Sequence, residues 1–502
     1  MIELIKSQYI VLIASLVAFI PVIVGGYIRK SLLRIVGYAA MLSALITGFI
    51  YGYVDLTSFL FAFLSLIVGF SSSMYTNLYE VLKYGSSDLH ILIDLFAFSI
   101  YITFIAPNIM LFIISWLIAE IVGFFAIVYE IKEETLRAGL RYLVVSMVPA
   151  DLALMTLLAY LAVLIGFSNA ISLPVTQIQD TISSMPSYIS IIILLGFSAK
   201  AAIAPLHFWL PDAHSLAPAP ASSILSGIMV KMGLYGILRI LPAIDISTTP
   251  IIFLILGGIS AVYGGLQAIA QSDIKRILAY STIENTGLMI ISTMLYKLTN
   301  SPICFAASIT LITAHALFKS ALFLNSGTVE VTTHTREIEK LGGLSRVIPQ
   351  ASTSALTSML SLMGVPPTIG FIAKLLLILS SIEFLIKNVV GGTLLLATIA
   401  VALALAIIYG VKYLAVYWGS WKAKDIEVSK NASSIIKWEF IPGFLGIAMA
   451  PLIPVLLNIA ITAEIVLAIA FSTALFILTI TYVHTRVKRI SYDSIWLGGE
   501  MP

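Results

Sequence analysis

The stretch of sequence that decides the fold reads Gly196-Phe-Ser-Ala-Lys200-Ala-Ala-Ile-Ala-Pro205-Leu-His207-Phe-Trp209-Leu-Pro211-Asp212-Ala-His214. Strongly apolar sequence flanks it on both sides. A charged side chain in hydrocarbon is costly, so an ionisable residue there usually faces the interior of a helix bundle and marks an ion pathway. Proline breaks a spanning helix, and such a break survives only where protein or a water-filled cavity satisfies the freed backbone groups. We therefore expect a broken, ion-handling helix at Pro205.

The amino-acid composition indicates a membrane protein. Of the 502 residues, 60% are hydrophobic and 11% are charged, whereas a soluble domain carries about a quarter charged residues. The single cysteine, Cys304, excludes a disulfide framework and a cysteine-ligated cluster. No glycine-rich phosphate loop or dinucleotide motif follows a strand pattern. We therefore expect no cofactor, no metal and no nucleic-acid partner, and we assign any redox chemistry to partner subunits.

Apolar segments of about 20 residues, the length that crosses a bilayer, recur along the chain. Their approximate ranges are 9–27, 35–53, 57–75, 89–106, 108–128, 136–166, 188–210, 220–241, 250–271, 277–296, 303–329, 352–380, 393–418, 440–459 and 462–483. The number becomes 14 if the last two segments form one helix. The sequence thus predicts an all-α polytopic membrane protein with 14 or 15 transmembrane helices.

The lysine and arginine residues are distributed unevenly over the loops between these segments. Most of them fall in the odd-numbered loops and the C-terminal tail, whereas the opposite side holds only Lys6, Lys297 and Lys387. Cytoplasmic loops of membrane proteins carry the excess of basic residues. We therefore expect a multi-pass protein of the cell membrane, with its N-terminus outside and its C-terminus in the cytoplasm.

A second proline-interrupted segment indicates an internal repeat. It reads Gly364-Val-Pro366-Pro367-Thr-Ile-Gly370-Phe-Ile-Ala-Lys374. Interrupted helices in corresponding positions of two halves are typical of transporters built from inverted repeats. We expect two inverted five-helix repeats, at residues 89–241 and 250–418, between N-terminal helices at 1–88 and C-terminal helices with a cytoplasmic tail at 419–502. The residues that correspond between the repeats are Glu120 and Glu284, Asp151 and His315, Lys200 and Lys374, and Lys231 and Lys412.

Four motifs resemble those of one membrane protein family. The first is the quoted stretch with Ala217-Pro-Ala-Pro220 and Lys231-Met-Gly-Leu-Tyr-Gly236, and the others are Gln271-Ser-Asp-Ile-Lys-Arg-Ile-Leu-Ala-Tyr-Ser-Thr-Ile-Glu284-Asn-Thr-Gly287, His315-Ala-Leu-Phe-Lys319 with Ser326-Gly327, and Gly364 to Lys374. They resemble the antiporter-like subunits of respiratory complex I, of membrane-bound nickel–iron hydrogenases and of Mrp cation/proton antiporters.

This resemblance covers roughly residues 55–420 and has two departures. The pair Glu284-Asn285 is more similar to the hydrogenase and formate-hydrogenlyase branch than to the other branches. The family glutamate usually follows a tryptophan directly, whereas Trp116 stands four residues before Glu120. One helical turn still places both side chains on the same face.

The resemblance implies proton transfer along buried charged side chains. Glu120 and Lys200 would form an ion pair whose opening and closing unloads and loads the lysine. Lys231 would be the central relay, and Lys374 would carry the proton on the exit side. The secondary relay residues that it implies are Glu284, His207, His315, Lys319 and Lys412. Water in the helix breaks at Pro205, Pro366 and Pro367 would carry protons between these stations.

Each of these residues also has a structural interpretation. Glu120 and Lys200 could form a static ion pair that fixes the helix register, and His207 could be a packing residue rather than a bridge between lysines. Lys412 could extend to the membrane interface, because tyrosines and tryptophans surround it. We expect polar packing roles for Asp94 and Asp151, and a gating or capping role at the broken helix for Asp212 and His214.

Three functions remain open from the sequence. We expect a proton-translocating subunit of a complex I-like or hydrogenase-type respiratory complex, with other membrane and peripheral subunits as partners. The alternatives are a subunit of a Mrp-type antiporter, which exchanges Na⁺ for H⁺, and a membrane scaffold that conducts no ions. The repeated charges within apolar segments argue against a scaffold, because burying each of them costs about 3 kcal/mol.

Overall fold

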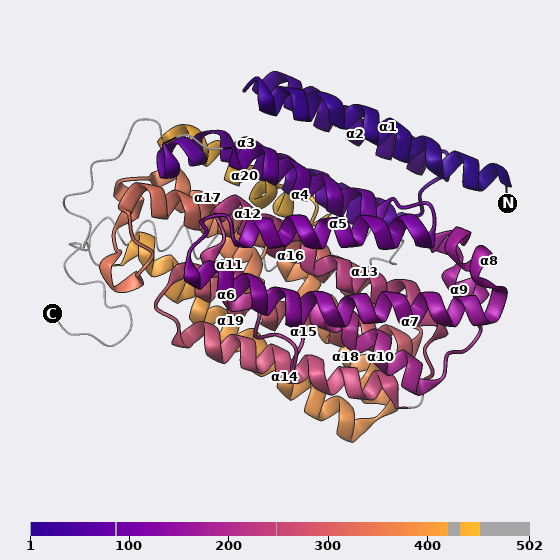
Figure 1. Ribbon diagram of the computed structural model, residues 1–502. Coiled ribbons are helices and arrows are strands. Elements are labelled where there is room, and N and C mark those ends of the chain that lie inside the picture. The colour runs from indigo at the N-terminus through magenta and orange to yellow at the C-terminus, as the bar shows by residue number, and fades with distance from the viewer. Residues whose placement is uncertain (1, 86–87, 247, 420–431, 452–502) are drawn as a thin grey trace.

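The computed structural model describes residues 2–85, 88–246, 248–419 and 432–451 of the chain. In these ranges the named elements are helices, most of which run roughly parallel or antiparallel to one another (Figure 1). Ten of the described helical segments are long and apolar enough to cross a membrane, and Leu89–Phe104 and Ser187–Lys200 are shorter apolar helices. The prediction of an all-α polytopic membrane protein is therefore confirmed.

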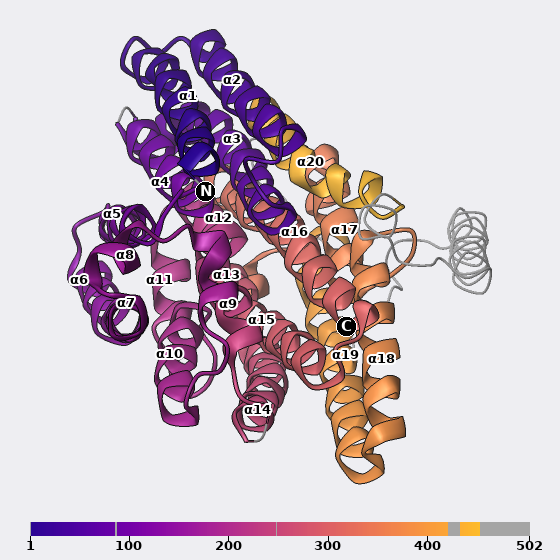
Figure 2. The ribbon, with the colours of Figure 1, turned by 90° about the vertical axis from the view of Figure 1, so that its right-hand side faces the viewer.

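The first four helices are α1 (Ile2–Tyr27), α2 (Ser31–Ile50), α3 (Leu56–Tyr84) and α4 (Leu89–Phe104). The hairpin of α1 and α2 lies at one edge of the bundle, and α14 lies on the opposite side (Figure 2). An ion pair of 2.7 Å between Arg34 of α2 and Asp94 of α4, both buried, attaches the hairpin. A buried charge needs such a partner, so the polar packing contact that we expected of Asp94 is an ion pair.

The next helices lead through the first helix break. They are α5 (Ile109–Ile127), α6 (Glu133–Tyr142), α7 (Val148–Ile165), α8 (Phe167–Ser172), α9 (Ile178–Thr181), α10 (Ser187–Lys200), α11 (Leu210–Leu216), α12 (Ala219–Ile224) and α13 (Val230–Ile240). A π-helical turn at Leu143–Met147 joins α6 to α7, and another at Leu225–Met229 joins α12 to α13. Each joined pair therefore crosses the membrane as one unit.

The remaining described helices surround one central helix. They are α14 (Thr249–Ala270), α15 (Ile274–Thr299), α16 (Pro302–Thr333), α17 (Pro349–Met363), α18 (Ile369–Lys387), α19 (Val389–Trp418) and α20 (Ala432–Ala448). The most apolar stretch of α16 is buried throughout, because α3, α12, α15, α17, α18 and α20 pack around it. The expected span 462–483 and most of the C-terminal tail lie outside the described residues.

The expected first repeat covers α4 to α13, and the expected second repeat covers α14 to α19. Each contains one of the two helix breaks. The inverted relation of the two repeats remains a prediction. The boundaries 89–241 and 250–418 remain a prediction.

The first helix break separates α10 from α11 and contains Pro205. The expected span at 188–210 is therefore not one continuous helix. The backbone N–H of Ala204 donates a hydrogen bond to Ser260 Oγ of α14 (2.8 Å), and Trp209 Nε1 donates to the carbonyl of Ala199 (3.0 Å). Protein groups thus satisfy backbone atoms that the interrupted helix leaves without a helical partner.

The second break separates α17 from α18 and contains Pro366 and Pro367. Gly364, which ends α17, has a φ of +80° that glycine adopts without a steric penalty. The N–H of Gly370 donates to Ser361 Oγ (3.3 Å), and Lys374 Nζ donates to the carbonyl of Leu362 (2.6 Å). The buried lysine therefore caps the helix that precedes it.

Gly233 provides a test of the packing at the first break. A Cβ atom on this residue of α13 would stand 2.2 Å from the carbonyl oxygen of Phe197 and 3.0 Å from the nitrogen of Ala201. Both are backbone atoms of the neighbouring segment, so the helices would have to separate. We expect Gly233→Ala to destabilise the protein by about 1–3 kcal/mol and to lower its melting temperature in detergent. Gly446→Ala is the control, because its Cβ would meet no atom closer than 3.5 Å; equal losses would contradict the prediction.

Candidate functional site: a chain of buried charged side chains

Glu120 and Lys200 form an ion pair in the first half of the bundle. Lys200 Nζ lies 2.8 Å from Glu120 Oε1, and both side chains are 0% exposed. The lysine is the last residue of α10, where the negative end of the helix dipole favours a cation. Tyr142 of α6 accepts a hydrogen bond from Lys200 Nζ (3.0 Å). Residues of α5, α6 and α10 therefore meet at this pair.

A second carboxyl group, that of Asp151 on α7, lies close enough to act electrostatically on both members of the pair. Glu120 Oε2 and Asp151 Oδ1 have no hydrogen-bond partner among the described residues. The arrangement is thus a cluster of two acids and one base rather than an isolated pair. Such a cluster can hold a variable number of protons, which goes beyond the packing role expected of Asp151.

Lys231 connects the two halves of the bundle. It follows the π-helical turn between α12 and α13, where its Nζ donates to the carbonyl of Ser226 (2.5 Å). The same Nζ is hydrogen-bonded to Nδ1 of His315 on α16. Both residues are buried. An imidazole ring can accept a proton on one nitrogen and release one from the other, so this contact can pass a proton from one half to the other.

Lys319 and Glu284 continue the chain in the second half. Lys319 lies one helical turn beyond His315, on the same face of α16. Its Nζ donates to the carbonyl of Leu278 (2.8 Å) and is hydrogen-bonded to the hydroxyl of Ser281, both on α15. Glu284, one turn further along α15, is hydrogen-bonded to the hydroxyl of Tyr409 of α19 and to the amide of its neighbour Asn285 (3.3 Å).

Lys374 and Glu284 correspond to Lys200 and Glu120, but they are separated. Lys374 Nζ donates to the carbonyl of Leu362 instead. The two charges influence each other, yet no ion pair within 4.0 Å joins them among the described residues. The structure therefore combines a closed acid–base pair in the first half with an open one in the second.

Two of the expected relay residues lie apart from this chain. The ring of His207, in the first break, packs 4.8 Å from the ring of Tyr263, and no hydrogen bond to a lysine is found in the described part of the chain. Lys412 is half-buried and donates to the carbonyl of Ile269 (2.7 Å) at the C-terminal end of α14. A cation at a helix C-terminus is a capping contact.

His214 of α11 lies nearer to the chain than His207 does. Its side chain is fully buried, its ring lies 5.4 Å from the ring of Phe323, and neither ring nitrogen has a hydrogen-bond partner among the described residues. The charges of Lys231, Lys319 and Lys275 act on it. The motif contained both histidines, but the sequence could not show which of them faces the lysines.

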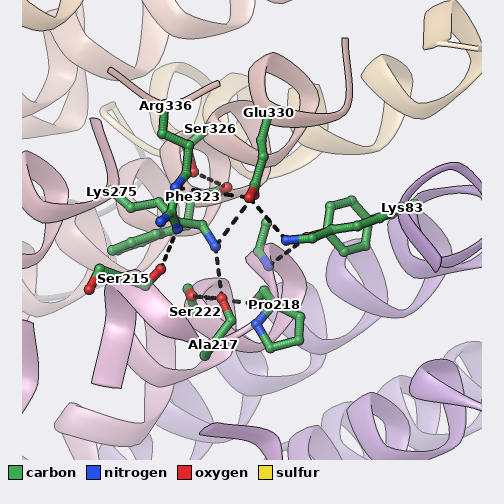
Figure 3. A network of polar contacts seen from close by, with 12 residues as sticks. Lys83, Ser215, Ala217, Pro218, Ser222, Lys275, Phe323, Ser326, Glu330 and Arg336 are labelled. Atoms are coloured by element: carbon green, nitrogen blue, oxygen red, sulfur yellow. Dashed lines mark hydrogen bonds and ion pairs between the residues drawn. The ribbon is translucent and has the colours of Figure 1, made fainter. Parts of the chain in front are cut away.

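A charged cluster at one end of the bundle holds α11 in place (Figure 3). The buried Lys275 Nζ lies 2.7 Å from the carbonyl of Ala217 and 3.8 Å from Glu330, which pairs with Lys83 at 3.0 Å. Arg336 donates to the carbonyl of Ser215 (2.5 Å).

At the other end of α11, Asp212 binds Arg141 and Arg276. These contacts secure the half-helix that follows the break, as we expected of Asp212.

Glu130, in the connection between α5 and α6, belongs to the same end of the bundle. Burial opposes ionisation of its carboxyl group. Hydrogen bonds from Lys132 (2.5 Å) and Tyr84 (2.9 Å) and the charge of Lys83 outweigh burial and lower its pKa to about 2. The carboxylate therefore stays ionised at neutral pH and holds the basic side chains around it.

The described residues contain no group of three or more histidine, cysteine, aspartate or glutamate side chains that could hold a metal ion. A surface groove of about 680 Å³ lies between α14 and the helices α18 and α19. Its lining is almost entirely apolar, which suits contact with lipid. The groove is therefore not part of the charged chain.

Known proteins resemble this chain in sequence. A family model described as "NADH:quinone oxidoreductase/Mrp antiporter, TM" matches residues 106–400. Hydrogenase-4 component B of Escherichia coli is 29% identical over 435 residues, which cover 82% of this chain and 62% of that protein. A Na(+)/H(+) antiporter subunit of Alkalihalophilus pseudofirmus is 30% identical over 334 residues, 65% of each chain. The matches thus span slightly less than two thirds of these two relatives.

Two solved structures have the same fold. A chain of the Mrp complex from Dietzia sp. superposes with a TM-score of 0.73 at 18% identity, over 91% of this chain and 96% of that one. A chain of the membrane-bound sulfane sulfur reductase, an archaeal respiratory membrane complex, superposes with a TM-score of 0.72 at 22% identity, over 86% and 75%. Both matches are parts of membrane complexes that contain several different chains.

Removing one member of the buried pair should destabilise the protein more than removing both. Glu120→Gln or Lys200→Met leaves a buried charge without its partner, which costs about 3–5 kcal/mol, and the double variant should recover much of this loss. Unfolding free energies measured by detergent titration test this cycle. The exposed pair of Glu133 and Arg137, 79% and 71% exposed, is the control and should couple by about 0.3–0.5 kcal/mol. Equal coupling in both pairs would be contrary to expectation.

Proposed function

Since the chain belongs to the transmembrane family of NADH:quinone oxidoreductase and Mrp antiporter subunits, we propose that it translocates protons as one subunit of a larger membrane complex. The observation that carries this proposal is the chain of buried acids and bases. A closed pair stands in one half, an open pair in the other, and Lys231 with His315 stands between them. Ionisable side chains at membrane depth mark ion pathways.

The proposed transfer begins at the closed pair. While Glu120 and Lys200 are in contact, each stabilises the charged form of the other, and the lysine keeps its proton. At an effective dielectric constant near 20, unit charges about 4 Å apart interact by roughly 4 kcal/mol. Opening the pair would therefore change the protonation equilibrium by a factor of about a thousand. That change is large enough to unload the lysine.

The route continues through the centre of the bundle. The proton would pass from Lys231 to His315 through their hydrogen bond, then to Lys319 one helical turn away, and on to Glu284 and Lys374. Stations that share no hydrogen bond need water between them. The two helix breaks are where the backbone departs from a continuous helix, and we propose that they admit this water.

We propose a hydrogenase-type or complex I-like respiratory complex as the parent assembly. The match to hydrogenase-4 component B covers 82% of this chain, and the pair Glu284-Asn285 is more similar to that branch. Electron transfer would take place on partner subunits. The similarity to the Na(+)/H(+) antiporter protein of Alkalihalophilus pseudofirmus supports a Mrp-type Na⁺/H⁺ antiporter as the second candidate.

The charged end of the bundle supports the orientation expected from the sequence. Lys83, Lys275 and Arg336 meet there, and the connection that holds Lys132 and Glu130 adds to it. Because basic residues concentrate on the cytoplasmic side, we propose that this end faces the cytoplasm, the N-terminus lies outside and the C-terminus lies in the cytoplasm.

Proton flux should depend on the buried pair. We expect Lys200→Met and Glu120→Gln to lower flux in inverted vesicles by about 100-fold or more, because the first removes the base of the pair and the second removes the acid in direct contact with it. A pH-sensitive dye in the vesicles measures the flux, and co-purification of partner subunits shows that the complex still assembles. Lys340→Met, at a lysine that is 64% exposed, is the control. Unchanged flux in the pair variants would favour the scaffold instead.

The coupling ion separates the two candidate assemblies. For a respiratory complex, we expect proton uptake into inverted vesicles to follow the redox reaction and to persist when Na⁺ is replaced by choline. Proton movement that occurs only with a Na⁺ gradient, in the absence of an electron donor, would support the Mrp-type antiporter. Matched measurements on vesicles from the Lys200→Met strain give the background.

A further inference from the structure

Glu439 of α20 is a fully buried carboxyl group outside the chain described above. Its Oε1 accepts a hydrogen bond from the amide of Asn325 (3.1 Å), and its Oε2 accepts one from the hydroxyl of Thr328 (2.8 Å). Both donors belong to the central helix α16. Among the described residues, no lysine, arginine or histidine forms an ion pair with it.

The groups that face Glu439 from the surrounding helices are neutral. They are Tyr75 of α3, Tyr413 and Tyr417 of α19, and Ser354 of α17. Tyr75 extends the contacts, because its hydroxyl lies 3.1 Å from that of Thr328. An ionised carboxylate that is buried without a counter-charge is costly, and such a group takes up a proton instead. The surroundings of Glu439 therefore oppose its ionisation.

A row of tyrosines on α19 lies between this site and Glu284, and no hydrogen bond among the described residues joins Tyr409 to Tyr413. Tyr409, Tyr413 and Tyr417 recur every fourth residue on one face of α19 and span about 12 Å. Tyr409 is hydrogen-bonded to Glu284. The hydroxyls of Tyr413 and Tyr417 donate to Asn325 Oδ1 at 2.9 Å and 2.8 Å, so the amide nitrogen of Asn325 points to Glu439. All three tyrosines are buried.

The position of the site along α16 places it between the central stations and the charged end. Asn325 follows Lys319 by six residues, about 9 Å along the helix, and precedes Glu330 by five, about 7.5 Å. Glu330 belongs to the cluster with Lys83 and Lys275. The buried carboxyl therefore lies on a route from the centre of the membrane to that end.

We propose that Glu439 is a further protonation site, which exchanges protons with Glu284 along the tyrosines of α19. Because these hydroxyls share no hydrogen bond, water between them would carry the proton from one to the next. Each tyrosine hydroxyl then receives one proton while it releases another, so the transfer leaves no net charge on the row. Asn325 is a positioning residue that fixes the carboxyl group. The role of Glu439 in proton transport rests on the proposed function, whereas the protonation of its carboxyl group does not.

The protonation can be measured without transport. The infrared difference spectrum between the wild-type protein and Glu439→Gln, both in detergent, contains the bands of this carboxyl group. We expect a carboxylic C=O band that shifts in D₂O and is replaced by carboxylate bands as the pH is raised from about 5 to about 10. Glu133→Gln, which removes an exposed glutamate, is the control for spectral changes that do not depend on the buried site.

Proton flux then tests whether Glu439 takes part in transport. We expect Glu439→Gln to lower flux at least about tenfold, Glu439→Asp to retain most of it, and the double change Tyr413→Phe with Tyr417→Phe to lower it as well. Co-purification of partner subunits and the melting temperature show whether each variant is folded. Glu439→Asp keeps a titratable group should the glutamine variant fail to assemble.

Three results would overturn the proposal or part of it. If the infrared spectra show Glu439 ionised at every pH, or protonated at every pH, it does not exchange a proton and the proposal is wrong. Normal flux in Glu439→Gln, together with lost flux in Lys200→Met, would exclude Glu439 from transport while the proposed function stands. Normal flux in all variants would refute the proposed function, and the infrared titration would still decide whether Glu439 exchanges a proton.

Discussion

The constraint on which the structure depends is that hydrocarbon offers no partner to a charge or to a backbone hydrogen-bonding group. Each unusual local feature is a response to it. Ser260 and Trp209 satisfy the backbone at the first break, and Glu120 and Tyr142 surround the Lys200 that ends α10. At the second break, Lys374 supplies the donor itself. Each helix break and the buried lysine next to it therefore form one structural unit.

The two halves meet this constraint differently, and the difference has a functional consequence. An anion holds Lys200, whereas a neutral backbone carbonyl holds Lys374. An ion pair retains the lysine proton more strongly than a carbonyl dipole does, by up to roughly 4 kcal/mol at an effective dielectric constant near 20. A relay needs a station that holds its proton and another that releases it. The closed pair and the open pair agree with this need of the proposed relay.

The sequence predicted more of the fold than of the site. Hydropathy and prolines located the long helices up to α19 and both breaks, because each of these signals is local, whereas the short helices α8 and α9 fell in none of the expected ranges. The contact of Glu439 with Asn325 joins positions 114 residues apart, and neither residue stands in a motif. Tyr413 and Tyr417 are among the tyrosines near Lys412 from which the sequence suggests a membrane interface, yet both are buried. His207 lies in the break between α10 and α11 and is partly exposed, whereas His214 lies on α11 and is fully buried; the end of the broken segment, which decides this, could not be located from the sequence.

The helix α16 carries residues of both the proposed proton chain and the Glu439 site. It is surrounded by six helices, so every polar side chain on it must find a protein partner. His315 and Lys319 face the central stations, Asn325 and Thr328 face Glu439, and Glu330 faces the charged end. The π-helical turn before Lys231 adds a residue to the helix turn and so changes the direction of that side chain relative to a regular helix. Lys231 can therefore reach His315 on α16. The residues of α16 that contact Glu439, Asn325 and Thr328, follow His315 on the way to the charged end.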